Sequence, residues 1–84
     1  MNSGQKKTLA AIFAVPTPRT LVWADIESLL LALGCEICEG AGSRVAFRRD
    51  GLKADFHRPH PGKEAKTYQI RDVKTFLTRL GERP

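Results

Sequence analysis

The sequence lacks the long apolar segments and targeting signals that mark many protein classes. Its longest apolar run, residues 29–34, is far shorter than the roughly 20 residues of a membrane-spanning helix, so no membrane partner is expected. The N-terminus lacks the segments of a signal peptide, which makes a cytoplasmic location the expectation. A chain of 84 residues has room for one domain with a thin core. We therefore expect a single domain over residues 1–84, with any chemistry on an exposed face.

Motifs for nucleotides, metals and redox chemistry are also missing. There is no phosphate-binding glycine motif and no G-x-G-x-x-G, and the acidic residues are too scattered to suggest a two-metal site. Cys35 and Cys38 have C-x-x-C spacing, but no second pair of zinc ligands lies at suitable spacing. The pair also follows a predicted helix end instead of beginning a helix, which argues against a redox role. We expect no metal, no small-molecule cofactor, and packing roles for both thiols.

What the sequence does contain is an uneven positive charge. Its 14 Lys and Arg outnumber 9 Asp and Glu, for a net charge of +5. Residues 1–43 carry three basic and four acidic residues, whereas residues 44–84 carry eleven and five, so the second half alone has a net charge of +6. A polyanion is the natural partner of such a field, and nucleic acid is the commonest one. A basic surface kept for solubility fits the total charge equally well.

Apolar spacing predicts three helices. The first covers residues 5–15, after four frayed residues, and is stopped by two prolines. The second begins at residue 21 or 22 and reaches residue 33, where Gly34 provides a C-terminal cap. The third runs from about residue 67 to residue 80. Each presents an apolar stripe with a period near 3.6, which is typical of helices packed on one side.

Between the second and third helices the apolar period changes to 2. Extended segments are predicted at 35–39, 44–49 and 52–57, and Asp50-Gly51 is a strong hairpin signal. Alternation turns Arg44, Arg48, Lys53 and His57 to one face of the sheet. The predicted order is α-α-β-β-β-α, an α+β fold whose three-stranded antiparallel sheet is covered by helices on one face.

A proline-rich loop follows the last strand, over residues 57–64, and holds both histidines of the chain. His57 and His60 flank Arg58, and Lys63 follows. A free imidazole exchanges a proton near neutral pH. Cleavage of RNA without a metal needs a base for the 2′-hydroxyl, an acid for the leaving oxygen, and cations for the phosphate. The loop supplies each residue type, although two hydrogen-bonded structural histidines in a rigid turn would give the same pattern.

Three strings of residues carry a resemblance to a known family: Trp23-x-x-Ile26-x-x-Leu29-Leu30-x-x-x-Gly34, then Glu39-Gly40-x-Gly42-Ser43-x-Val45-x-Phe47, then His57-Arg58-Pro59-His60-Pro61. Roughly two-thirds of the chain, residues 23–80, resembles the HicA toxins of bacterial HicAB toxin–antitoxin systems. The resemblance implies a double-stranded-RNA-binding-domain-like α-β-β-β-α core over residues 21–81, with the helix at 5–15 as an addition. It also implies an mRNA interferase, an endoribonuclease that cleaves mRNA, and a HicB-type antitoxin that blocks its active face.

One position departs from the family pattern. The usual catalytic histidine follows the Gly-Ser pair, and Arg44 stands there. Arginine stays protonated at neutral pH and is not an ordinary general base. Three outcomes are open: proton transfer by His57 or His60 with Arg44 holding the phosphate, RNA binding without cleavage, or an inactive form that binds a partner. The candidate catalytic residues are His57 and His60, and the candidate RNA-binding residues are Ser43, Arg44, Arg48, Lys53, Arg58 and Lys63.

Overall fold

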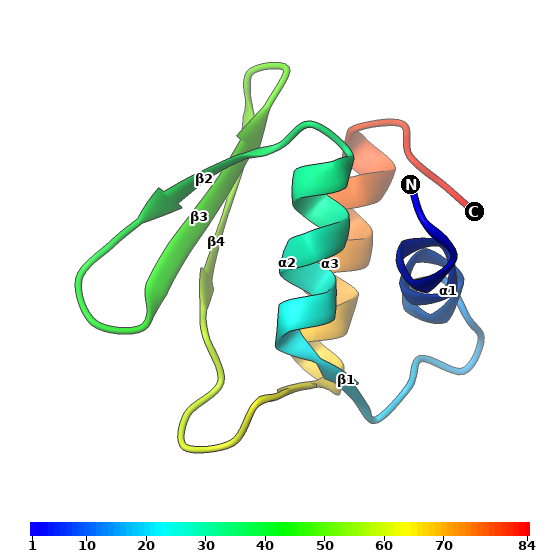
Figure 1. Cartoon of the computed structure of the whole chain (residues 1–84), viewed down its shortest axis with the longest axis horizontal. Coiled ribbons are helices and arrows are strands. Elements are labelled where there is room, and N and C mark those ends of the chain that lie inside the picture. The colour runs from blue at the N-terminus through cyan, green and yellow to red at the C-terminus, as the bar shows by residue number, and fades with distance from the viewer.

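Three helices and two antiparallel sheets make up the structure, a computed structural model that describes residues 1–84 (Figure 1). In chain order the elements are α1 (Ser3–Ile12), β1 (Thr20–Val22), α2 (Trp23–Ala32), β2 (Glu36–Glu39), β3 (Arg44–Arg49), β4 (Leu52–His57), β5 (Glu64–Lys66) and α3 (Thr67–Arg79). One sheet has the order β2-β3-β4 and the other pairs β1 with β5. The predicted α+β fold with a three-stranded antiparallel sheet is confirmed.

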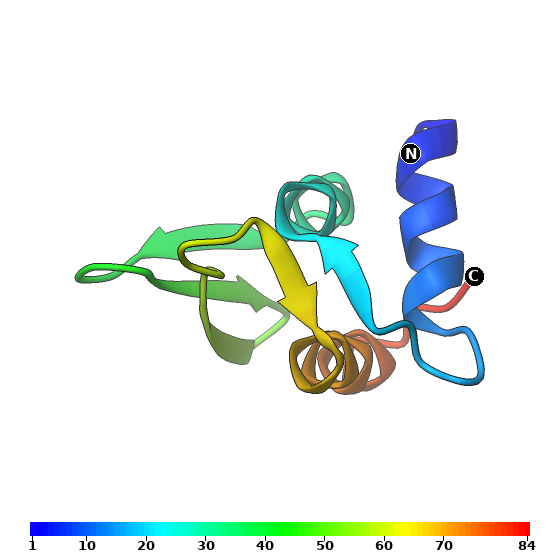
Figure 2. The same ribbon diagram turned by 90° about the horizontal axis from the view of Figure 1, so that it is seen from below.

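The elements form three layers. The β2-β3-β4 sheet packs on α2 and α3, and α1 packs on the opposite side of these two helices (Figures 1 and 2). A single apolar cluster joins the layers, and its buried members are Leu9, Ile12, Trp23, Ile26, Leu29, Leu30, Cys35, Val45, Phe47, Phe56, Ala65, Ile70, Val73, Phe76 and Leu77. None of the three helices is long and apolar enough to cross a membrane.

The register of the sheet confirms the predicted faces. Val45 pairs with Phe56 on the side toward the helices, whereas Arg44 pairs with His57 on the outer face. Because directly opposed residues of antiparallel strands share a face, the side chains of Arg44 and His57 are neighbours. Ala46 also lies on the outer face, yet it is buried, since it is a small residue in the middle strand between Cys38 and Asp55.

Two short strands were missed by the sequence-based prediction. Residues 20–22 were expected to lead into or begin a helix, and residue 64 was expected to lie in a loop. Instead, β1 and β5 form an antiparallel ribbon in which Leu21 pairs with Ala65. Figure 2 shows this ribbon at the ends of α2 and α3, from which both helices begin. A three-residue strand is too short to show a period of 2, so only the tertiary pairing reveals it.

The first helix is displaced from its predicted bounds of 5–15. It begins at Ser3, because the Asn2 side chain accepts a hydrogen bond from the Gln5 amide at 2.8 Å and the Gln5 side chain accepts one from the Asn2 amide at 2.9 Å. This capping box orders residues that were expected to be frayed. The helix ends at Ile12 with Phe13 as its C-cap, three residues before the predicted end at Val15.

Arg49 fastens the hairpin to the helices. Its guanidinium donates to the backbone oxygen of Leu33 at 2.9 Å and of Leu80 at 3.1 Å, directly after α2 and α3 respectively. It also pairs with Glu82 at 2.7 Å. A cation at a helix C-terminus satisfies free carbonyls and complements the helix dipole. One side chain of β3 therefore holds two helix ends in place against the sheet.

Candidate functional site

A cleft of about 410 Å³ opens where β4 ends and α3 begins. Its lining includes four of the residues that the sequence singled out: Ser43, His57, Arg58 and His60. They come from the turn before β3, the end of β4 and the loop that follows. Lys66 and Tyr68, at the start of α3, form the facing wall. The fold thus gathers both histidines into one exposed site.

His57 is the best-defined group of this cleft. It lies opposite Arg44 in the β3–β4 register, and its Nδ1 is 3.3 Å from the Ser43 hydroxyl oxygen. Which of these two atoms donates depends on the tautomer of the ring. The second ring nitrogen, Nε2, has no protein partner. His57 is therefore oriented through one ring nitrogen, while the other is open to a ligand.

The backbone around His57 is held by a buried glutamine that the sequence reading missed. Gln69, only 6 % exposed, donates from its side chain to the His57 carbonyl at 2.8 Å and accepts from the Lys66 amide at 3.1 Å. On the other side, the Arg58 amide donates to the Ser43 carbonyl at 2.8 Å. These bonds tie β4 to α3 and to the turn before β3. The sequence offers one signal for this role: Gln69 is a polar residue that lies beside the apolar stripe of its helix.

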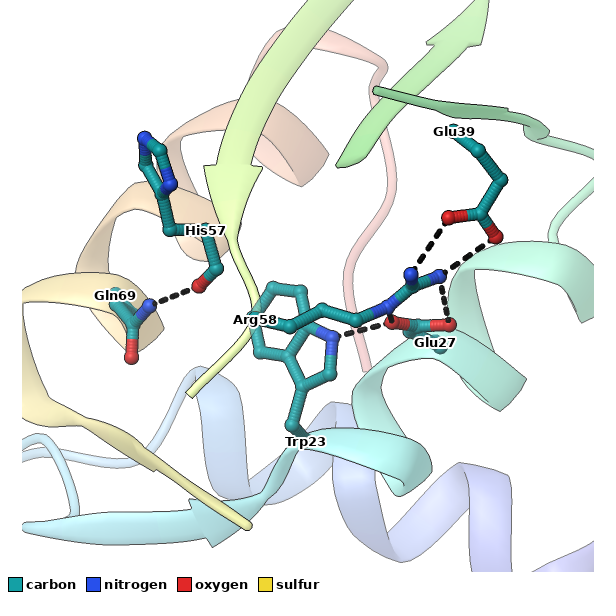
Figure 3. A network of polar contacts seen from close by, with 6 residues as sticks. All are labelled: Trp23, Glu27, Glu39, His57, Arg58 and Gln69. Atoms are coloured by element: carbon teal, nitrogen blue, oxygen red, sulfur yellow. Dashed lines mark hydrogen bonds and ion pairs between the residues drawn. The ribbon is translucent and has the colours of Figure 1, made fainter. Parts of the chain in front are cut away.

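Arg58 joins helix α2 to strand β2 (Figure 3). It donates to Glu27 at 2.7 and 3.3 Å and to Glu39 at 2.6 and 3.0 Å. Glu27 also accepts a bond from the indole of Trp23. Hydrogen bonding to Arg58 holds the pKa of Glu39 below its usual range, and the two carboxylates raise the pKa of Arg58. The guanidinium is thus committed to two protein carboxylates, and the RNA contact predicted for Arg58 stays a prediction.

A second hollow, about 680 Å³, lies on the outer face of the sheet and shares His57 with the cleft. Arg44 and Lys53 line it. Arg44 is exposed and has no carboxylate partner, whereas Lys53 is 3.7 Å from Asp55. The turn before Arg44 depends on Gly40, because a Cβ there would lie 2.9 Å from the Arg44 Cβ. Arg44 is therefore the free cation beside His57.

The remaining predicted RNA contacts, Arg48 and Lys63, do not line the cleft that holds both histidines. Arg48 is on the outer sheet face, where it forms an exposed ion pair with Glu36 at 3.1 Å. Lys63 lines a neighbouring hollow of about 350 Å³ that includes Trp23 and Arg58. Its carbonyl accepts from the Trp23 amide at 2.9 Å, which extends the pairing of β1 with β5.

The two cysteines have different environments. Cys35 is buried in the core, and desolvation by this burial raises the pKa of its thiol. Cys38 is partly exposed on the outer sheet face, in the hollow beside Arg44. Nowhere does the structure gather three or more His, Cys, Asp or Glu side chains that could hold a metal ion.

The arrangement of one three-stranded antiparallel sheet with helices on one face is that of the double-stranded-RNA-binding-domain-like α-β-β-β-α proteins. Within that class, the family described as the HicA toxin of bacterial toxin–antitoxin systems matches residues 23–81, and the chain belongs to this family. It is accordingly a toxin-type component whose partner is of the antitoxin kind. Helix α1 lies outside the matched residues. Comparison with curated proteins and with solved structures gives no significant match.

Proposed function

We propose that the protein is a cytoplasmic, metal-independent endoribonuclease that cleaves mRNA and is neutralised by a HicB-type antitoxin covering the cleft. The observation that carries the proposal is the position of His57. It is the direct partner of Arg44 on the neighbouring strand, and Arg44 occupies the position of the family's usual catalytic histidine. His57 also shares a cleft with His60. An imidazole is thus available next to the position from which the usual one is missing.

The cleft contains the groups that cleavage at an RNA phosphate requires. One histidine removes the proton of the 2′-hydroxyl, and the 2′-oxygen then forms a bond to the adjacent phosphorus. The bond from phosphorus to the 5′-oxygen breaks, and the second histidine gives that oxygen a proton. The products are a 2′,3′-cyclic phosphate and a 5′-hydroxyl. Arg44, permanently charged and unpaired, stabilises the negative charge that grows on the phosphate oxygens.

The proposal is tested by incubating the purified protein with a labelled mRNA fragment in the presence of EDTA. We expect cleavage, and a loss of about 100-fold or more in the His57→Ala and His60→Ala variants, because a positioned acid or base contributes about 10²- to 10⁴-fold. Lys7→Ala, which removes an exposed charge on α1, is the control and should cleave normally. Cleavage that is unchanged in both histidine variants would sink the assignment.

A second candidate function is RNA or partner binding without cleavage, and the observation in its favour is Arg44 itself. Arginine at this position supplies a strong phosphate ligand but cannot act as the base that the family's usual histidine would be. This alternative predicts salt-dependent RNA binding that weakens in Arg44→Gln, and no cleavage products at any protein concentration.

The antitoxin part of the main proposal is tested by expressing the chain with and without a HicB-type protein. Growth arrest should occur only when the HicB-type protein is absent.

A further inference from the structure

The cations of the outer sheet face are largely neutralised by carboxylates on the same face. Arg48 pairs with Glu36 at 3.1 Å, and Lys53 lies 3.7 Å from Asp55. Together with Arg44, these five charged side chains have a net charge of only +1. Much of the charge of the second half of the chain must therefore act elsewhere on the surface.

The outward side of α3 has the opposite character. Tyr68, Arg71, Thr75 and Arg79 are all exposed, and neither arginine pairs with a carboxylate. Their spacing of three and four residues places them in one row along the helix, where such neighbours are about 5–6 Å apart. Asp72 is the only acidic residue on this side of α3. Figure 2 shows no other element covering the side of α3 that faces away from α2.

This row begins inside the cleft. Tyr68 is 61 % exposed and lines the cleft together with His57 and His60. Lys66, one residue before α3, lines the same wall and has no carboxylate partner. From Tyr68 to Arg79 the helix rises about 16 Å at about 1.5 Å per residue. At about 3.4 Å per nucleotide of a stacked strand, that length corresponds to about five nucleotides.

We propose that a single strand of RNA leaves the cleft along α3, with a base stacked on Tyr68 and phosphates on Arg71 and Arg79. The proposal rests on the proposed function for the identity of the ligand as RNA. A single strand is specified because an exposed aromatic ring stacks on the face of an unpaired base, which a duplex does not offer. This path does not include Arg48 and Lys53, which the sequence predicts as RNA-binding residues.

The test measures binding of the intact protein to a labelled 2′-O-methyl oligouridylate. This probe lacks the 2′-hydroxyl nucleophile, so binding is measured without cleavage. Arg71→Gln/Arg79→Gln is compared with Arg48→Gln/Lys53→Gln, which changes the net charge by the same amount. For single strands the slope of log affinity against log salt is about −0.7 per phosphate contact. We expect the α3 variant to reduce the slope by about 1.4, and the sheet variant to change it little.

When the salt concentration is raised from about 50 to about 200 mM, this difference in slope makes the wild type lose about sevenfold more affinity than the α3 variant. Tyr68→Ala should weaken binding about 5- to 150-fold and Tyr68→Phe should not, because the ring that stacks is kept. Since Arg79 also lies in the last turn of α3, thermal unfolding of each variant is recorded to show that the fold is intact.

Each result decides the question. A slope that falls in the sheet variant and not in the α3 variant overturns the path along α3. Equal effects of the two variants overturn it as well, since they indicate only a general field. If neither the wild type nor the variants bind the probe, the path is overturned too. The row on α3 would then be a candidate surface for an acidic protein partner. If Arg71→Gln/Arg79→Gln leaves the salt slope unchanged while cleavage still depends on the histidines, the path along α3 is refuted and the proposed nuclease activity stands.

Discussion

Removal of the Arg58 guanidinium should destabilise the protein more than removal of any exposed cation. In Arg58→Leu, Glu27 loses two charged hydrogen bonds while its side chain stays only 18 % exposed, with the Trp23 indole as its one remaining partner. Hydrogen bonds to charged groups contribute about 1.5–3 kcal/mol, and a half-buried carboxylate left unpaired adds a desolvation penalty. The bonds to the more exposed Glu39 add little. We expect a loss of about 2–3 kcal/mol of unfolding free energy.

Thermal unfolding followed by the fluorescence of Trp23, the single tryptophan, measures this loss directly. For a domain of this size, about 2–3 kcal/mol corresponds to a fall in Tm of about 10–20 °C. The matched control is Arg48→Leu, which removes an arginine whose ion pair with Glu36 is exposed on both sides. Its Tm should change by much less, since exposed pairs contribute little. Glu27→Gln keeps an acceptor for the indole and should give an intermediate result.

A clear result would refute this reasoning. If Arg58→Leu and Arg48→Leu unfold at the same temperature, the contacts between Arg58 and Glu27 do not stabilise the fold, whatever their distances. A double variant, Arg58→Leu with Glu27→Gln, gives a second check. Because the two residues are in direct contact, their effects should not add, and the coupling should exceed about 0.5 kcal/mol. Additive losses would show that each side chain acts through other neighbours.

Three further outcomes are expected. The pKa of Glu39 lies below its ordinary 4.5, so the small stabilisation from this exposed carboxylate is complete above that pH and is lost as the pH falls through the lowered value; the difference in urea unfolding between about pH 5 and pH 3 should therefore be slightly smaller in Arg58→Leu than in the wild type. Iodoacetamide should label Cys38 in the native protein and Cys35 only in denaturant, as measured by mass spectrometry, because burial protects Cys35 and raises its pKa. Gly40→Ala should lose about 1–3 kcal/mol in urea unfolding, because its Cβ would lie 2.9 Å from a side chain of β3.

Periodicity was enough to predict the fold class and the faces of the sheet. The change of apolar period after Gly34, together with the Asp50-Gly51 turn, placed β3 and β4 correctly, and the register then put Arg44 beside His57. Local sequence signals suffice for these features because each is set by residues close together in the chain. The three strings that resemble the family led to the same fold.

The partners of the charged residues were beyond the reach of the sequence. Arg58 contacts Glu27 and Glu39, which lie 31 and 19 positions away, and nothing in the local pattern distinguishes it from an arginine that faces a ligand. The ion pairs of Arg48 and Lys53 are likewise visible only once the strands are paired. A count of charges therefore predicted a basic half correctly but could not show where on its surface the charge is free.

The ribbon of β1 and β5 has a consequence for when the cleft can form. It pairs Thr20 with Lys66, positions that are 46 residues apart, so the chain between them must be closed into a loop before the pairing exists. Contacts of such long sequence separation form late, because the entropy of closure is lost before the contact contributes. The cleft wall at Tyr68 directly follows this ribbon. A growing chain that ends between β4 and α3 would thus carry His57 without the wall that completes the site.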